Sequence, residues 1–443
     1  MTDVAATQST ESTQSSESAE STIGGGAPDA AVDGPVDGPV AGGPVGAGGR
    51  LLAAARLAAP AIGLYLGLRA ISLDVLAAIL VYARPREPGR LVYWDGSTDT
   101  WRGYRAITDV LLSWDGRWYS LLAAEGYPDL AGSDEHGIPY THRLAFFPLY
   151  PLLARPFTLL PGVSGGTACM IVSFVSSIAA AWGLFAIGNL IKDRRFGIMF
   201  AALWAVAPVC MAQNGAFTES LFTALSAWSL YAVLTRRWLV AGALCGLAGA
   251  CRPNAMALAA AIGVSALIAV VRRRDGWRPY VGTALAPLGY VAVILYAGSR
   301  LGNVTGFFEL QRNYWDAYFD YGKSTVEYIG TAMLTHEPYN NHVFLLTALV
   351  VVLYGLLILL AAVDRAPLPL MVFAVVLFIG SAGSHGKFSF LDRHMMPIFP
   401  ALIVPAAGLA KAKFRTQVVL LPALAVLSGW YGGWLPFGSG HLI

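Results

Sequence analysis

The sequence predicts an all-α integral membrane protein with about eleven transmembrane helices. Hydrophobic residues make up 56% of the 443 residues, charged residues only 13%, and the mean hydropathy is +0.56. A soluble protein cannot bury that much apolar surface. Between short basic loops, apolar runs recur that approach the roughly 20 residues needed to cross about 30 Å of hydrocarbon. They include 57–81, 178–191, 239–251, 280–297, 344–363 and 418–430.

The first 50 residues differ in composition from the rest. Residues 1–49 are mostly Ser, Thr, Gly, Ala and Pro, with seven acidic residues and no basic one. Such a segment buries too little apolar area to offset chain entropy, so we expect residues 1–50 to be a disordered acidic tail. It lacks the basic start of a signal peptide, so the first helix should remain as an anchor. Residues 51–443 then form the polytopic membrane domain.

Loop charges predict the orientation, because short cytoplasmic loops are enriched in Lys and Arg. The tail is then cytoplasmic, and the first and second large extracytoplasmic loops are 84–166 and 299–343. This parity requires that residues 144–160 do not span the membrane. Pro148, Pro151 and Pro156 favour a re-entrant or interfacial segment there, although a true span is the alternative. The loops expected inside are 192–195, 236–237, 272–278, 365 and 411–415.

In the first large loop, the apolar residues of 104–127 recur at helical spacing, which predicts an amphipathic interfacial helix. On that helix Asp115 would lie at the border of the apolar face. Partial desolvation makes a carboxylate a better proton acceptor, and the neighbouring Arg117 would moderate the effect. Asp115 is therefore the candidate general base. The alternative is that Asp115 only solvates or caps the helix.

Other polar residues lie on the same predicted side of the membrane. Glu219 and Arg252 fall at helix ends, where they would position a hydroxyl and bind a phosphate, or simply pair with each other. Gln311 and Trp315 combine hydrogen-bonding and stacking groups suited to a sugar, or pack against the membrane.

The last predicted extracytoplasmic loop carries cations, which runs against the charge bias of such loops. Lys387 and Arg393 are therefore candidates for binding a phosphate, with contact to lipid head groups as the alternative. The net charge of +3 is too small and too scattered to indicate nucleic acid. No DxD pair, Walker A loop or HExxH occurs, so no metal and no cofactor is expected.

Several short motifs together resemble the PIG-V family of GPI mannosyltransferases, which are GT-C membrane glycosyltransferases. The motifs are WDGRWY at 114–119, EGY at 125–127, AFFPLYP at 145–151, TESLF at 218–222, RPN at 252–254, QRNYW at 311–315, and more weakly DRH at 392–394 and FP at 399–400. Each motif alone is weak, but five in order are fairly specific. The long acidic tail has no family counterpart.

The resemblance implies a GT-C helical bundle that uses a polyprenyl-phosphate-mannose donor at an extracytoplasmic site. It implies a single displacement that inverts the anomeric centre without metal, with Asp115 as the base for the acceptor hydroxyl. The Ala- and Gly-rich composition suggests a bacterial member in the plasma membrane, with a lipid-linked or cell-envelope glycan as acceptor. The expected substrate-binding residues are Trp114, Arg117, Tyr119, Glu219, Arg252, Gln311, Trp315, Lys387 and Arg393.

Two other classes of function fit part of the pattern. A lipid or sugar transporter would also have many helices with polar ends, although no internal repeat is visible. A non-catalytic subunit could use residues 1–50 as a docking arm for envelope-biosynthesis partners. The enzyme hypothesis predicts chemical transfer of a sugar, whereas the transporter hypothesis predicts that the intact substrate moves without chemical change. In both cases the protein contacts membrane lipids.

Overall fold

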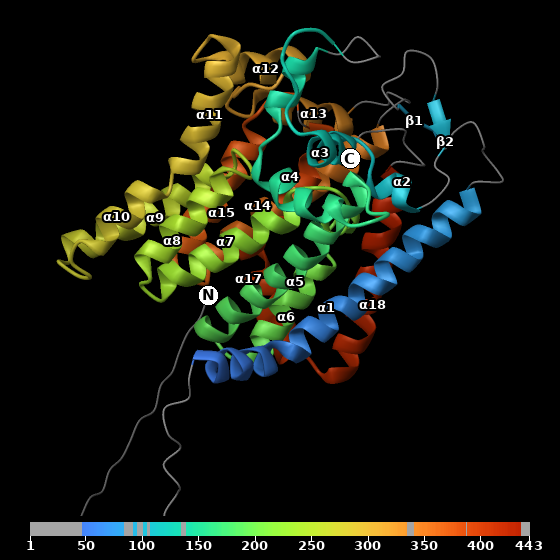
Figure 1. The fold of residues 1–443 in the computed structure, drawn as a ribbon. Helices are drawn as coiled ribbons and strands as arrows, with labels where there is room; N and C mark the ends of the chain where they lie inside the picture. Colours follow the sequence, from blue (N-terminus) through green and yellow to red (C-terminus); the bar gives the residue numbers. More distant parts are fainter. Residues whose placement is uncertain are drawn as a thin grey trace, which may run out of the picture. The chain divides into compact units, whose positions relative to one another are not determined.

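The computed structural model confirms a helical membrane protein (Figure 1). It describes residues 47–83, 92–94, 101–103, 107–133, 139–334, 341–386 and 388–435. The described residues from 52 to 435 form one compact unit. The predicted tail lies outside the described residues except for its last four, 47–50, which begin the first helix. Its disorder and docking role stay predictions.

Eleven apolar helices of the described residues correspond to the predicted spans, if α10 and α11 are taken as one. Four stretches have the length and composition of a span: 52–82 in α1, α5, α10 with α11, and 342–363 in α14. The others are shorter or less apolar. The bounds are α1 Ala47–Ala83, α5 Gly165–Ile191, α6 Arg194–Ala205, α7 Glu219–Leu234, α8 Trp238–Gly249, α9 Ala255–Val271, α10 Arg278–Leu285, α11 Leu288–Leu301, α14 Asn341–Val363, α15 Leu368–Ala382, α17 Ile403–Lys411 and α18 Phe414–Trp434.

The proline-rich segment 144–160 is broken into short turns of helix, as the parity argument required. A 3₁₀ turn at Tyr140–Ala145 leads to α4 (Leu149–Ala154) and a second 3₁₀ turn at Arg155–Leu159. These eleven helical residues cover about 19 Å, roughly two thirds of the hydrocarbon core. This segment therefore does not span the membrane as one helix.

The prediction of one amphipathic helix over 104–127 was wrong. The structure has α2 (Ile107–Leu111) and α3 (Asp115–Glu125), separated by a turn in which the Ser113 hydroxyl donates to the Val110 carbonyl. Trp114 has a φ of 57°, which no α-helix accommodates. Asp115 is consequently the first residue of a new helix rather than a residue in the middle of one.

The same loop also contains a short antiparallel strand pair, which the all-α prediction did not include. Strand β1 (Val92–Trp94) pairs with β2 (Trp101–Gly103), with Tyr93 opposite Arg102. The second large loop contains two helices, α12 (Gly306–Trp315) and α13 (Lys323–Leu334). In Figure 1, the elements α12, α13, α3 and the strand pair all lie at one end of the bundle.

Glycines let α8 approach its neighbours closely, and α8 leads directly to Arg252. A Cβ added at Gly242 would lie 2.2 Å from the Gly282 carbonyl oxygen, and one at Gly289 would lie 1.7 Å from that of Gly246. Backbones this close accept only glycine, as in small-residue packing between membrane helices. The depth of α8, and hence of Arg252, is therefore set by backbone contact.

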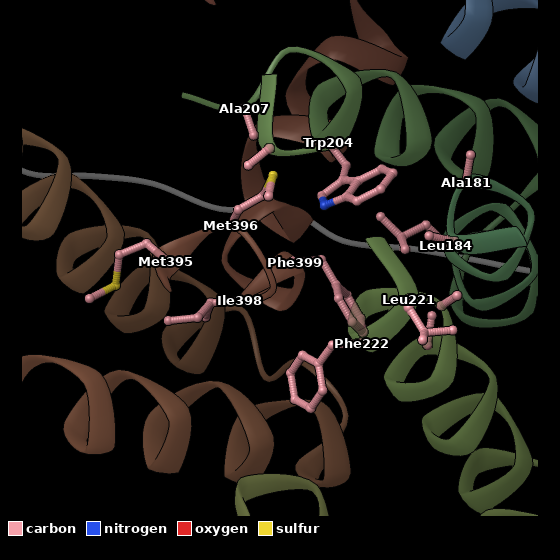
Figure 2. Close-up of a cluster of buried hydrophobic side chains, with 14 of the residues drawn as sticks. Ala181, Leu184, Trp204, Ala207, Leu221, Phe222, Met395, Met396, Ile398 and Phe399 are labelled. Carbon is pink, nitrogen blue, oxygen red and sulfur yellow. The ribbon is translucent and has the colours of Figure 1, made fainter. Parts of the chain in front are cut away.

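A large aromatic core lies behind the last short helix, α16 (Leu391–Met395). Figure 2 shows Phe399 extending toward Phe222 of α7, in the same cluster as Trp204 of α6. Phe399 also packs its ring against Phe200 and Phe373, with centroids 6.1 and 5.7 Å apart. This core anchors the chain just after α16 and so limits where α16 can lie.

The basic loops that were predicted to share one side of the membrane contact one another. Lys192 lies 3.5 Å from Asp364, and Arg195 donates to the carbonyl of Ala412. Asp275 accepts a hydrogen bond from the Trp238 indole. These contacts agree with the predicted grouping of the loops on one side, although they do not say which side is cytoplasmic.

Candidate active site

Four charged residues from distant parts of the chain meet in one cluster, which we call the ion cluster: Asp115, Glu219, Arg252 and Arg393. The Arg393 guanidinium pairs with Asp115 and, through Nε, lies 2.8 Å from Glu219 Oε1. Arg252 Nη1 lies 2.5 Å from the same Glu219 oxygen. All four were predicted site residues, and the alternative of a Glu219–Arg252 ion pair is also what the structure contains.

The loop between η3 (Cys210–Gln213) and α7 brings the cluster together. The Ala216 amide donates to the Leu111 carbonyl, and a Cβ on Gly116 would lie 3.2 Å from the Ala216 Cβ, so this loop packs against the start of α3. The ring of Phe217 lies under the Arg393 guanidinium at 5.0 Å. The Thr218 hydroxyl accepts a hydrogen bond from Arg252 at 3.0 Å. The start of the TESLF motif, with Phe217 before it, therefore packs against the two arginines of the cluster.

Burial divides the two carboxylates of the ion cluster. The Glu219 side chain is completely buried, whereas the Asp115 side chain is 32% exposed. A buried charge is tolerated only when it is compensated, and Glu219 has two guanidiniums beside it. Asp115 is thus the carboxylate that a substrate can reach, and Glu219 acts as a fixed counter-ion between the two arginines.

Tyr119, one turn after Asp115, links the ion cluster to an aromatic group. Burial raises the pKa of Tyr119 well above its usual value, and the nearby Asp115 charge raises it further. The Tyr119 ring meets Phe146 edge-on, with centroids 5.2 Å apart. Its hydroxyl therefore stays protonated and can donate a hydrogen bond.

The aromatic group itself surrounds His142, and we call it the aromatic cluster. The centroid of the His142 ring lies 4.6 Å from that of Trp118, 4.8 Å from that of Trp315, 4.6 Å from that of Tyr314 and 5.5 Å from that of Phe146. Trp315 was predicted to face a sugar, and it lies here with its ring against a histidine. Trp118, Tyr314 and Trp315 are each partly exposed, so the cluster presents ring surface to its surroundings.

The remaining predicted residues are placed less decisively. Trp114 is half-buried before α3, and its indole N–H has no hydrogen-bond partner among the described residues. Arg117 lies over the Trp118 ring, 6.0 Å from its centroid. Gln311 is half-buried on α12, and no side-chain contact joins it to the ion cluster. Lys387 lies outside the described residues.

Sequence reasoning missed two charged residues near the site. Arg69 is buried in α1 and donates to the Asn214 side chain, on the loop that leads to the ion cluster. A single arginine inside the apolar run 57–81 was the signal that could have found it. Asp392 appeared only as part of a motif, but it is buried directly beside Arg393. Among the described residues, no three His, Cys, Asp or Glu side chains gather to hold a metal ion.

Part of the chain matches a known family. Residues 147–297 match the model of the dolichyl-phosphate-mannose-protein mannosyltransferases. A stretch of 135 residues is 30% identical to the mouse protein GPI alpha-1,6-mannosyltransferase 2 and covers 28% of this chain and 27% of the mouse protein. Over these stretches the chain is similar to mannosyltransferases. The matched family region contains Glu219 and Arg252 of the ion cluster, whereas Asp115 and Arg393 lie on either side of it.

Two solved structures are also similar to this chain. ArnT of Cupriavidus metallidurans, bound to undecaprenyl phosphate, is 17% identical with a TM-score of 0.46, over 82% of this chain and 63% of ArnT. The oligosaccharyltransferase of Archaeoglobus fulgidus in its apo form is 15% identical with a TM-score of 0.42, over 83% of this chain and 55% of that protein. This chain thus spans less than two thirds of each of these proteins and about a quarter of the mouse protein.

Proposed function

We propose that the protein transfers a mannosyl residue from a polyprenyl-phosphate-mannose donor to a lipid-linked or cell-envelope glycan. The observation that carries the proposal is the ion cluster, which joins one accessible carboxylate to two arginines. A carboxylate and neighbouring cations are what inverting transfer from a sugar phosphate needs. The match to mannosyltransferases supports mannose as the sugar.

In the proposed reaction, Asp115 accepts the proton of the acceptor hydroxyl while the oxygen attacks the anomeric carbon. The bond from that carbon to the phosphate oxygen breaks, and the lipid phosphate leaves with the electron pair. Arg393, helped by Arg252, stabilises the negative charge that grows on this phosphate. Carboxylate and guanidinium suffice for these roles, so the proposal includes no metal.

Arg393 has two tasks in this scheme, and they connect the substrates. While it pairs with Asp115, it occupies the carboxylate that would otherwise accept the proton of the acceptor hydroxyl. A donor phosphate competes for the same guanidinium, because charge-assisted pairs with phosphate are strong. Donor binding therefore frees Asp115 to act as the base.

The aromatic cluster is the proposed sugar contact. Trp315 is partly exposed beside His142, and Tyr119 lies close to the Asp115 charge. Aromatic faces pack well against the apolar faces of sugars. Trp114, Arg117, Gln311 and Lys387 remain proposed contacts of the donor or the acceptor. The loop charges support a location of this end outside the cytoplasm, in the plasma membrane.

The decisive test is transfer of radiolabelled mannose from polyprenyl-phosphate-mannose to endogenous lipid acceptors. Membranes with the wild-type protein should form labelled product, whereas membranes with Asp115→Asn should form none, because Asn keeps the shape but cannot accept the proton. Asp129→Asn is the matched control, since it makes the same change at an exposed position of the same loop.

Product from Asp115→Asn at the wild-type rate would remove Asp115 as the base. No product from either protein, together with movement of intact donor across the membrane, would support the transporter alternative. Equal expression of the three proteins, measured by quantitative blotting, shows that the comparison concerns turnover rather than folding.

A further inference from the structure

Asp392 is a buried carboxylate that the proposed reaction does not use. It is 2% exposed, and both of its oxygens accept hydrogen bonds. One oxygen accepts from the backbone N–H of Arg393 at 2.8 Å, and the other from the Tyr431 hydroxyl at 2.5 Å. A short segment of α16 is thereby tied to α18 at the residue that carries the site arginine.

The surroundings of Asp392 come from three helices. Tyr431 lies on α18, and Tyr354 and Thr347 lie on α14, which packs against α16 together with α15. The sequence of α15 contains no titratable group. On α16 itself the charged or titratable neighbours are Arg393 and His394. Among the described residues, the Tyr431 hydroxyl donates to Asp392 from another helix.

α16 is only five residues long, so it cannot hold its own position by helix formation. Its place depends on the aromatic core after it and on the Asp392 contacts within it. Asp392 fixes the backbone of Arg393, and the Arg393 side chain then reaches Asp115 on α3 and Glu219 on α7. A slight shift of α16 would separate these pairs, because the guanidinium meets both carboxylates at once.

We infer that Asp392 and Tyr431 are positioning residues for Arg393, which hold its guanidinium between Asp115 and Glu219. The inference rests on the proposed function only in giving Arg393 the donor phosphate. Burial raises the pKa of Asp392 to about 6, so the carboxylate is ionised at neutral pH and accepts both hydrogen bonds.

The position of Arg393 can be measured without any transfer reaction, through a cysteine at position 115. A guanidinium beside a thiol lowers the thiol pKa, and the rate of alkylation by iodoacetamide against pH reports that pKa. The residue at 115 is partly exposed, Cys169, Cys245 and Cys251 are buried, and Cys210, the fourth cysteine of the chain, is replaced by Ser in every variant. The full chain carrying Asp115→Cys is therefore the reporter.

In this reporter, Asp392→Asn and Tyr431→Phe should each move the alkylation midpoint toward higher pH, and Arg393→Gln sets the full extent of the shift. Tyr150→Phe is the matched control, since it removes another buried tyrosine hydroxyl, one bonded to Ser173, and should leave the midpoint unchanged. Unshifted midpoints in both Asp392→Asn and Tyr431→Phe, with Arg393→Gln shifted, would overturn the inference.

A second measurement separates this inference from the proposed function. With residue 115 native, Asp392→Asn and Tyr431→Phe should raise the KM for the donor about tenfold, with a smaller effect on kcat. A shifted midpoint in a protein that transfers no sugar would keep the positioning role and reject the transferase. Transfer with a normal KM and an unshifted alkylation midpoint would keep the transferase and reject the positioning role.

Discussion

The two ends of the helical bundle use charge in opposite ways. At one end, Asp115, Glu219, Arg252 and Arg393 form a connected network in which Glu219 is completely buried. At the other end, Lys192 and Asp364 form a single pair whose side chains are 39% and 52% exposed. The first arrangement holds its charges in fixed positions away from water, whereas the second leaves them solvated.

The difference separates a site from an orientation signal. Exposed ion pairs are screened by water and contribute little to stability. The basic loops matter instead through their number of Lys and Arg residues near the membrane, which sets the orientation of the helices. Buried charges are costly, and a protein keeps them where geometry matters. The predictions below test this contrast, beginning with the largest expected effect.

Glu219→Gln should destabilise the protein most, because it leaves Arg252 and Arg393 buried with one counter-ion fewer. Removing one partner of a buried ion pair costs about 3–5 kcal/mol. Thermal unfolding of the purified protein in detergent measures the loss. The double variant Glu219→Gln with Arg252→Gln should recover part of it, and a double variant less stable than Glu219→Gln would contradict the assignment of Glu219 as counter-ion.

Arg393→Gln should lower kcat/KM for the donor by about a hundredfold, because it removes the cation proposed to stabilise the leaving phosphate. Kinetics with varied polyprenyl-phosphate-mannose measure this. Arg252→Gln should act in the same direction. Arg300→Gln, an exposed arginine at the same end that contacts Tyr296, is the control. Unchanged donor kinetics in both Arg393→Gln and Arg252→Gln would exclude them from the donor site.

The affinity for the donor should fall by about tenfold between pH 7 and pH 5. Burial raises the pKa of Asp392 to about 6, so the group gains a proton as the pH falls through that value and loses its hold on Arg393. The KM for polyprenyl-phosphate-mannose, a phosphodiester whose own charge does not change in this range, is measured against pH and detects the change. Asp392→Asn should bind weakly but evenly across this range, and a drop of the same size in that variant would assign the titration to another group.

Lys192→Ala should have the smallest effect, below about 1 kcal/mol of unfolding free energy and without change in transfer. Asp364→Ala should behave alike, and the double variant should show almost no coupling. Thermal unfolding at low and high salt measures both. A coupling as large as that between Glu219 and Arg252 would erase the contrast between the two ends.

Much of the fold could be predicted from simple patterns, because a long apolar run in a sequence predicts a transmembrane helix. The division of segment 144–160 into short helical turns agrees with its three prolines. The break at 112–114 could not be predicted, because helical spacing continues through it while Trp114 takes a positive φ. The strand pair was missed because three-residue strands are too short to leave a periodic pattern.

For the site, helix-end polarity and motif order identified all four members of the ion cluster. The contacts among them could not be predicted, since Asp115 and Arg393 are joined only by the tertiary fold. His142 was overlooked because a single histidine in a loop has no distinguishing spacing. The role of Asp392 depends on Tyr431, 39 residues later on another helix, and no local pattern connects the two.

The shared counter-ion Glu219 also implies an order of assembly during synthesis. Glu219 enters the membrane with α7, when neither arginine has yet been made, and Arg252 follows after α8. Arg393 arrives only after four further membrane helices, with α10 and α11 taken as one, and its tether Tyr431 arrives with α18. Because chains are made from the N-terminus, Glu219 pairs first with Arg252, and the cluster closes only when α18 is inserted. The protein therefore becomes competent late, at the insertion of α18.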